Sequence, residues 1–264
     1  MQGVDVSVYQ GKVDWAVAHA NGIDFAFARV SDGTGFPDME FANNWPAMKA
    51  AGVVRGAYQF FRPEEDPTAQ ANLFVSMLSA ASGLVPGDLP PVLDLEVTDS
   101  TSDAAIQAHM QTWFDAMKAA TGLQPMLYMS PGFASHAGTA FGNHPLWVAN
   151  WGVSCPAVPG GWSTWAFWQK SDTGMVKGIA SAVDLDEFNG SLAQLPVLGG
   201  SLDGGIGGPG PGGPAHDAGR QDAAVDGGSA PAPGDAGTAA EAGGRYDAGA
   251  GTQGGSAGSS GPCR

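Results

Sequence analysis

The sequence has little cysteine, few basic residues and no long apolar run, and each shortage excludes a class of protein. Its two cysteines, Cys155 and Cys263, are too few for a disulfide framework and wrongly spaced for a zinc site, so we expect Cys155 to be an inert thiol. Eleven lysines and arginines stand against 26 acidic residues and form no patch, which argues against nucleic acid or an anionic membrane as a partner. No apolar run reaches about 18 residues, so we expect no membrane span.

Two further signals are missing. The start of the chain, Met1 to Asp5, lacks a basic segment followed by an apolar one, so we predict no secretory signal peptide in this chain. The histidines show neither metal-ligand spacing nor an acid partner in a triad pattern, which argues against a metal site and against Ser or Cys nucleophilic hydrolysis. They are His19, His109, His136, His144 and His216. We therefore expect no metal and no cofactor.

The composition changes near residue 197 and divides the chain into two predicted parts. After Ile206 the only large apolar side chains are Val225 and Tyr246, among repeated glycine, alanine, proline, aspartate and serine. Such a segment buries too little apolar surface to offset the entropy of ordering it. We predict a folded domain over residues 1–196 and a disordered tail over residues 197–264.

Strand-like segments recur through the predicted domain and at first alternate with helical ones. Helical spacing follows Asp14, runs over 40–51, begins again at Asp66 and covers 103–120. The eight predicted strands cover residues 3–7, 24–30, 53–61, 91–97, 125–130, 145–151, 164–169 and 182–188. Five strand-plus-helix units and three further strands predict an α/β fold with a closed, TIM-like barrel. Most strands should be parallel, and the last ones can pair antiparallel.

The fourth predicted strand carries two acids. Asp94 and Glu96 are two residues apart, so they share one face of the strand, roughly 6 to 7 Å apart along the backbone. Leu93 and Leu95 then face the other way and can pack against helices. Two acids on a strand made for burial are costly unless they lie in a wet or functional cavity. A structural pair satisfied by hydrogen bonds or by a cation is the alternative.

Other acids lie near the predicted strand ends. In barrels of this type the chemistry is located at the carboxyl ends of the strands. By that rule Asp5, Asp32 and Asp184 should meet Asp94 and Glu96 at one mouth. Acids from four separate strands are a stronger signal than the pair alone.

Several short motifs occur in an order that is similar to a known family. Residues 3–7, 10–11 and 13–15 resemble the opening signature of the glycoside hydrolase family 25 lysozymes, and residues 91–96 resemble the family's central acid motif. The remaining motifs lie at residues 29–33, 56–60, 146–149, 168–169 and 183–190. The resemblance covers residues 3–190 and implies a flattened TIM-like barrel of five β/α units plus three strands.

The resemblance also implies an N-acetylmuramidase that cleaves the β-1,4 bond from N-acetylmuramic acid to N-acetylglucosamine in peptidoglycan. Glu96 would be the general acid, which requires a raised pKa. For Asp94 three roles stay open. It could be a nucleophile at a carboxyl separation of ~5 to 5.5 Å, or a base for water at ~6.5 to 9.5 Å. In the third route, which we favour, it orients the substrate's own N-acetyl group.

The resemblance implies supporting roles for further residues. Asp5 and Asp184 would hold the acid pair in place, Asp184 being preferred to Asp186. Asp32 replaces a commoner Glu and is as well explained by structural support, and Gln59 replaces a commoner His. Aromatic side chains that could stack on sugars are Tyr58, Tyr128, Trp147 and Trp168, although barrel interiors also use aromatics for packing.

Two other functions fit the same residues. One is a non-catalytic saccharide-binding relic of the barrel, suggested by Gln59 and Asp32, and the other is a different barrel glycosidase, such as one that cleaves chitin. The resemblance makes peptidoglycan glycan strands the expected partner. We expect a monomer that acts outside the cell or at a cell wall.

Overall fold

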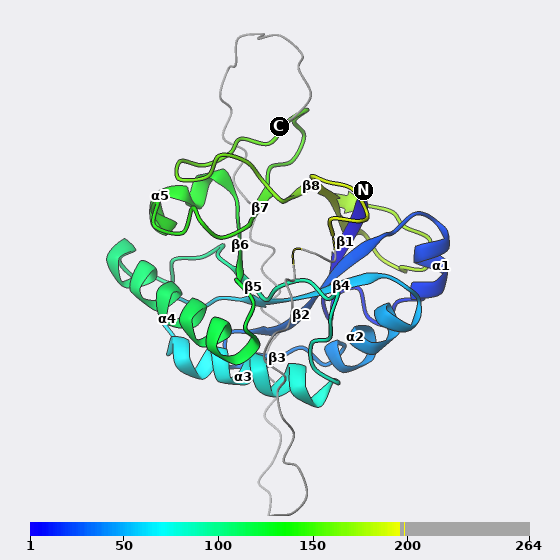
Figure 1. Cartoon of the computed structure of the whole chain (residues 1–264), viewed down its shortest axis with the longest axis horizontal. Coiled ribbons are helices and arrows are strands. Elements are labelled where there is room, and N and C mark those ends of the chain that lie inside the picture. Colours follow the sequence, from blue (N-terminus) through cyan, green and yellow to red (C-terminus); the bar gives the residue numbers. More distant parts are fainter. Residues whose placement is uncertain (196–197, 199–264) are drawn as a thin grey trace, which may run out of the picture. The chain divides into compact units, whose positions relative to one another are not determined.

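The computed structural model describes residues 1–195 and 198, and its sheet closes into a barrel. The strands follow the order β1-β9-β8-β7-β6-β5-β4-β2, and pairing of β1 with β2 closes the ring (Figure 1). The strands are β1 (Gln2–Val6), β2 (Phe25–Asp32), β3 (Phe36–Pro37), β4 (Val54–Phe60), β5 (Val92–Asp94), β6 (Met126–Met129), β7 (Leu146–Ala149), β8 (Phe167–Gly174) and β9 (Val183–Phe188). The two-residue β3 pairs with the end of β2, outside the ring. The predicted α/β barrel is therefore confirmed.

The helices lie outside the ring of strands (Figure 1). They are α1 (Trp15–Ala20), α2 (Phe41–Ala50), α3 (Pro67–Ala80), α4 (Asp103–Thr121) and the single turn α5 (Ala134–Ala137), which follows the 3-10 turn η1 (Pro131–Phe133). None of the helices in the described part of the chain combines the length and the hydropathy that a membrane crossing needs.

Local sequence sets where these helices begin and end. The carboxylate of Asp14 accepts a hydrogen bond from the backbone N–H of Val17 at the start of α1. Asp66 does the same for Ala69 at the start of α3, where Pro67 occupies the first turn. The last turn of α4 ends at Gly122, whose φ of 72° is a conformation that glycine adopts without a steric penalty.

Alternate strand residues build two separate cores. Leu93 and Leu95 point outward and join the apolar cluster between the sheet and the helices, as predicted. Val92 points inward and joins the second cluster, which fills the barrel. In that cluster the rings of Phe27 and Trp147 stack with centroids 4.2 Å apart. The interior is thus closed by aromatic packing, and only the carboxyl ends of the strands remain for polar groups.

Glycine makes room for this aromatic filling. A Cβ atom at Gly56 would overlap the ring of Phe27, and one at Gly3 would overlap the ring of Phe25. Both rings have no exposed surface. The glycines in the first and third predicted strands are therefore required by close approach of side chains inside the barrel.

Three details differ from the predictions or lie beyond them. Within the closed ring of described strands, only β9 is antiparallel to its neighbours, β1 and β8, whereas β7 and β8 are parallel. Cys155 takes part in a disulfide, so the prediction of an inert thiol is wrong. The predicted tail lies outside the described residues, apart from Leu198, and remains a prediction.

Candidate active site

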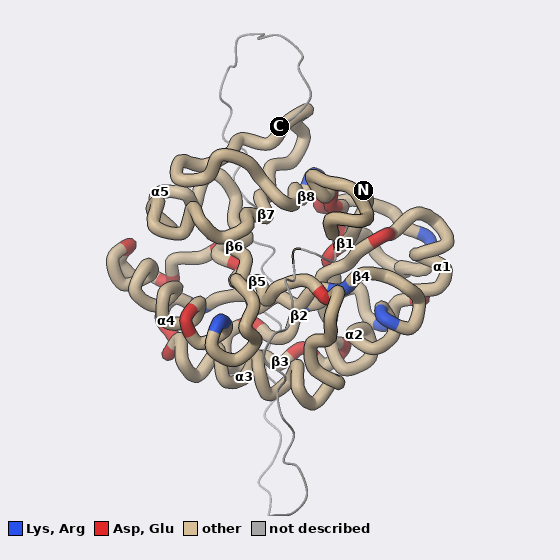
Figure 2. The backbone as a smooth tube through the Cα atoms, viewed as in Figure 1, with Lys and Arg blue, Asp and Glu red and all other residues tan. Residues whose placement is uncertain are grey.

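Acidic side chains from three strands meet at the carboxyl ends of the parallel strands. Asp5 lies near the end of β1 and Asp94 at the end of β5, with Glu96 two residues further on. Because β9 runs antiparallel, its first residues lie at this same end, and Asp184 is directly opposite Asp5. Figure 2 shows how acidic residues recur on the strands around the barrel, whereas lysine and arginine are few.

Asp94 and Glu96 form one hydrogen-bonded pair. Burial raises the pKa of both carboxyl groups, because a charged carboxylate loses solvation inside the barrel. The charge of Glu96 and the hydrogen bond between the two groups raise the pKa of Asp94 further. Two such carboxyl groups in contact cannot both ionise at low cost, so the pair holds a proton above the usual pH range of either acid.

Asp5, Asp184 and Asp186 form a second group of carboxyls. The carboxyl of Asp5 is hydrogen-bonded to those of both Asp184 and Asp186. Burial raises the pKa of Asp5 well above its usual range, and the charge of Asp186 adds to this. Burial, followed by the charge of Asp5, raises the pKa of Asp184 to about 9. Each carboxyl–carboxyl hydrogen bond needs a proton, so this group also retains protons at neutral pH.

Hydrogen-bond donors fix the orientation of the Asp5 and Asp186 carboxyl groups. The indole Nε1 of Trp151 and the hydroxyl of Tyr128 both donate to Oε1 of Gln169, each at 2.9 Å. The amide Nε2 of Gln169 therefore faces Oδ2 of Asp5 and donates to it at 2.8 Å. At the other end, Nε1 of Trp147 donates to Oδ1 of Asp186 at 2.9 Å. Gln169 thus orients the Asp5 carboxyl.

Two tyrosines and one arginine complete the surroundings. Burial raises the pKa of the Tyr58 and Tyr128 hydroxyls. The charge of Asp5 raises the pKa of Tyr58 further, and the charge of Glu96 does the same for Tyr128, so both hydroxyls stay neutral donors. The positive charge of Arg29 lowers the pKa of Asp94, but this is the smallest of the effects on that carboxyl. Arg29 makes its ion pair with Asp38 instead, at 3.1 Å. The acid pair is therefore not neutralised by a basic partner.

Within the described residues, no set of three or more His, Cys, Asp or Glu side chains is arranged to hold a metal ion. The protons on the carboxyl groups are therefore the charges that the described side chains provide to offset their repulsion.

Comparison with known proteins identifies the family. The model of the glycosyl hydrolases family 25 matches residues 4–179. Lysozyme M1 of Streptomyces globisporus is 38% identical over 212 residues, covering 75% of this chain and 71% of that protein. The chain belongs to glycosyl hydrolase family 25.

Further relatives of this family 25 hydrolase agree. The N,O-diacetylmuramidase of a Chalaropsis species is 34% identical over 216 residues, covering 75% of this chain and 98% of that protein. The crystal structure of a bacterial lysozyme from Streptomyces coelicolor has 34% identity and a TM-score of 0.69, over 76% of this chain and 98% of that one. The chain is therefore a glycoside hydrolase with the family's TIM-like barrel.

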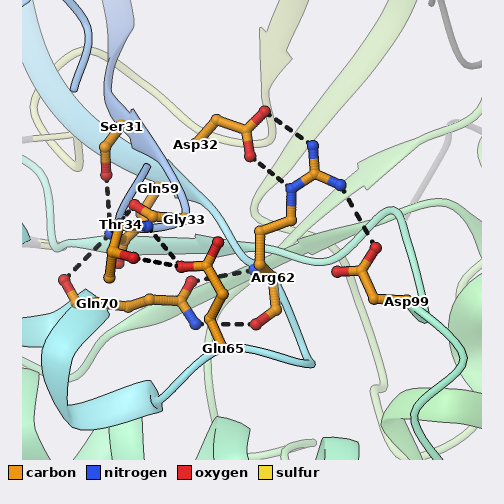
Figure 3. Close-up of polar contacts among 9 residues, drawn as sticks. All are labelled: Ser31, Asp32, Gly33, Thr34, Gln59, Arg62, Glu65, Gln70 and Asp99. Carbon is orange, nitrogen blue, oxygen red and sulfur yellow. Dashed lines mark hydrogen bonds and ion pairs between the residues drawn. The ribbon is translucent and has the colours of Figure 1, made fainter. Parts of the chain in front are cut away.

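Asp32 lies at the end of β2 but is committed to another partner (Figure 3). Arg62 donates to both of its carboxylate oxygens, at 2.6 and 3.0 Å, and also contacts Asp99 at 3.4 Å. Charge-assisted pairs of this two-bond geometry hold both side chains in place. The contacts account for Asp32 by structural support of the loops at the mouth, and its role as a substrate ligand stays a prediction.

Two predicted sugar-binding residues are placed away from the mouth. Gln59 has no exposed surface and lies between the sheet and the helices, where it bonds Ser31 and the backbone of Gln70 (Figure 3). The indole of Trp113 donates to its side-chain oxygen. Trp168 also packs in this outer cluster and donates to a backbone carbonyl. Each residue is one position from an inward-facing neighbour, and adjacent strand residues face opposite ways, so neither side chain faces the mouth and their predicted sugar contacts stay predictions.

The other predicted aromatics do point into the barrel. Tyr58 and Tyr128 lie among the acids, as described above, and retain only a small exposed area. Trp147 is almost completely buried beneath them and stacks on Phe27. In this structure the contacts of Trp147 are with Phe27 and Asp186, to which its indole N–H donates, and its predicted role in stacking on sugars stays a prediction.

Sequence reasoning missed Gln169 and Trp151 as residues of the site, and it preferred Asp184 to Asp186. Gln169 was seen as part of a motif, but not as the partner of Asp5. Asp186 has no exposed surface and bonds Asp5 and Trp147, and its two-residue offset from Asp184 was the available signal. Trp151 follows β7 and bonds Gln169 from a partly exposed position. Its place just after a strand end was the available signal.

The acid cluster makes the fold more stable at acidic pH. The carboxyl pKa values are raised in the folded state, so the folded chain binds more protons than the unfolded chain from about pH 4 up to about pH 9, the pKa of Asp184. The contribution of these carboxyl groups to the unfolding free energy is therefore fully present at low pH and is lost as pH rises through this window. We expect the Tm to fall by about 3 °C or more per pH unit for each extra proton held, as measured by calorimetry. A Tm that rises from pH 5 to pH 9 contradicts this.

Gln59 should matter for stability and not for chemistry. Gln59→Ala leaves the Trp113 indole and the Ser31 hydroxyl without partners in a buried layer, so unfolding free energy should fall by about 2 to 4 kcal/mol. Urea unfolding measures this loss, with the exposed Gln111→Ala as the matched control. Hydrolysis per folded molecule at 25 °C should stay within about twofold, because Gln59 touches none of the acids. A large loss of activity in the folded variant would restore Gln59 as a site residue.

Proposed function

We propose that this family 25 hydrolase cleaves the β-1,4 bond between N-acetylmuramic acid and N-acetylglucosamine in peptidoglycan, with Glu96 as the general acid. The observation that carries the proposal is the convergence of Asp94, Glu96, Asp5 and Asp184 at the carboxyl ends of the parallel strands, where burial raises the pKa of each carboxyl group. The names of the relatives, lysozyme and N,O-diacetylmuramidase, support the choice of peptidoglycan as substrate.

The contact between the two carboxyls bears on the mechanism. The hydrogen bond that shifts the pKa values of Asp94 and Glu96 favours a close pair over the wider separation of ~6.5 to 9.5 Å that a water-activating pair needs. Among the described residues, Oδ1 of Asp94 is buried and has no hydrogen-bond partner. An unpaired carboxylate oxygen is costly unless a ligand supplies a donor. The N–H of the substrate's N-acetyl group is such a donor, which supports the substrate-assisted route.

The proton shared by the pair can then reach the leaving group. When the N-acetyl N–H binds Asp94, the ionised form of Asp94 is favoured, and its proton passes along the existing hydrogen bond to Glu96. Glu96 donates that proton to the glycosidic oxygen as the bond to the muramic acid breaks. The N-acetyl oxygen attacks the same carbon, and water later opens the resulting ring and returns a proton to Glu96. Asp94 gives its proton up only when substrate is present.

The remaining acids support the positive charge that develops on the sugar. The charge of the ionised member of the Asp5, Asp184 and Asp186 group faces a site where burial weakens screening by water. Such a fixed charge stabilises an oxocarbenium-like transition state more than the neutral substrate. Asp5 and Asp184 are proposed to act in this way and to hold the acid pair in place.

The structure gives no separate support for a saccharide-binding relic. It was suggested by Gln59 and Asp32, and the contacts of both residues now have structural explanations. We propose that the chain acts as a monomer on the glycan strands of bacterial walls, outside the cell or at the wall itself.

Glu96→Gln tests the general acid. The amide keeps the size of the side chain but cannot donate the catalytic proton, so kcat should fall by about 100-fold to 10,000-fold with little change in the Tm. Release of reducing sugar from purified peptidoglycan measures this. The matched control is Glu187→Gln, which changes only an ion pair with Lys170. Wild-type turnover by Glu96→Gln would reject the assignment.

The role of Asp94 is tested with altered substrate. If the N-acetyl group attacks, peptidoglycan whose muramic acid carries a free amine should resist cleavage by the wild type, because the attacking oxygen is absent. Products and enzyme are analysed by mass spectrometry. A glycosyl group attached to Asp94 would show instead that Asp94 is the nucleophile. Cleavage of chitin oligomers as fast as peptidoglycan would favour the chitin-type alternative.

A further inference from the structure

Exposed apolar side chains are concentrated in two segments beside the barrel mouth. The described residues include eight exposed large hydrophobics, and four of them are Val8, Tyr9, Phe36 and Met39. Tyr9 and Phe36 are the only aromatics of the eight, and each exposes 73% of its surface. Scattered apolar residues on a surface need no explanation, but a cluster that includes both exposed aromatics does. We call these four residues the apolar rim.

Strand register and one aspartate bring the two segments of the apolar rim together. The first half of β2 pairs with β1, and its last residues pair with β3 on that same side, so β3 lies beyond the end of β1. Asp38 then joins the segments, since its Oδ2 accepts from the backbone N–H of Val8 at 2.8 Å and from Arg29 at 3.1 Å. The guanidinium of Arg29 lies 5.3 Å from the centroid of the Tyr9 ring.

Several hydrogen bonds hold the β2–β3 turn in place. Both the backbone N–H and the hydroxyl of Thr34 donate to Oε2 of Glu65, at 2.6 and 2.7 Å (Figure 3). The N–H of Gly33 donates to the carbonyl of Phe60 at 2.9 Å. These bonds fix one side of the turn, and Asp38 fixes the other. A ring presented on so restrained a turn loses little conformational entropy when a ligand binds.

The apolar rim is continuous with the acid pair. Phe36 pairs with Asp32, Asp32 with Phe60, and Phe60 with Asp94, in one line across β3, β2, β4 and β5. Three strand spacings of about 4.8 Å place Phe36 about 14 Å from Asp94 along the sheet. Arg29 lies between the two sites, because it contacts the Tyr9 ring and its charge acts on Asp94.

We propose that the apolar rim is a second glycan-binding surface, on which Tyr9 and Phe36 stack against sugars of the same strand that lie away from the cleaved bond. The inference rests on the proposed function, because it takes its occupant from the polymer at the acid pair. Aromatic faces pack against the C–H faces of sugar rings, and the N-acetylglucosamine units of the proposed substrate present such rings without a charge. The surface therefore favours long glycan strands over short fragments.

The test compares long and short substrates. The ratio to be measured is kcat/KM for long, peptide-free glycan strands divided by kcat/KM for a tetrasaccharide. In the full-length double variant Tyr9→Ala/Phe36→Ala this ratio should fall about tenfold. Most of this change should appear in the KM for long strands. The control Leu192→Ala removes another exposed apolar side chain, which follows β9 at the opposite end of the barrel, and should leave the ratio unchanged. Phe36→Tyr keeps a ring and should retain the wild-type ratio.

Two further measurements keep the outcome decisive. Glu65→Ala removes the clamp on the turn and should lower the same ratio by a smaller factor. In the inactive Glu96→Gln chain, the double substitution should weaken sedimentation with insoluble peptidoglycan about tenfold. An unchanged ratio and unchanged sedimentation would overturn the apolar rim and leave the proposed function intact. A wild type that cleaves neither substrate would overturn the proposed function, while sedimentation would still test the surface.

Discussion

Repulsion among carboxyl groups is the constraint on which the rest of this site depends. Asp5, Asp94, Glu96, Asp184 and Asp186 are held together at the end of one barrel. Burial raises the pKa of each, and neighbouring carboxylate charges raise it further for all of them except Glu96. The structure relieves the repulsion by keeping protons in the hydrogen bonds between the acids. A general acid needs such a proton at neutral pH, so the arrangement that costs stability is also the one suited to hydrolysis.

The barrel supplies the rigidity that this arrangement needs. Stacked aromatics fill the barrel interior. The indole of Trp147 orients Asp186 directly, and the indole of Trp151 orients Gln169. The antiparallel strand β9 is equally necessary, because only that direction brings Asp184 and Asp186 to the mouth. Gln169 connects these features, as it takes hydrogen bonds from an indole and a tyrosine and gives one to Asp5.

Much of the fold and part of the site could be predicted from residue pattern. Strand-and-helix rhythm predicted the barrel, and the two-residue spacing of Asp94 and Glu96 predicted their pairing. The same alternation separates the inward Tyr58 from the outward Gln59, and the outward Trp168 from the inward Gln169. Resemblance to a motif does not contain that distinction. The contacts of Asp38 with Val8 and Arg29, and those of Arg62 with Asp32, depend on loop geometry that local pattern does not contain.

The most direct test of this account is a carbon-13 NMR titration of the aspartate and glutamate carboxyl groups in the folded protein. The account predicts that the carboxyls of the cluster still carry protons at pH 7, with Asp184 titrating at about pH 9. It also predicts that Asp186→Asn lowers the pKa of Asp5, because the substitution removes the neighbouring charge that raises it. If every carboxyl group has lost its proton by pH 5, the acids are solvated independently and the proposed proton store does not exist.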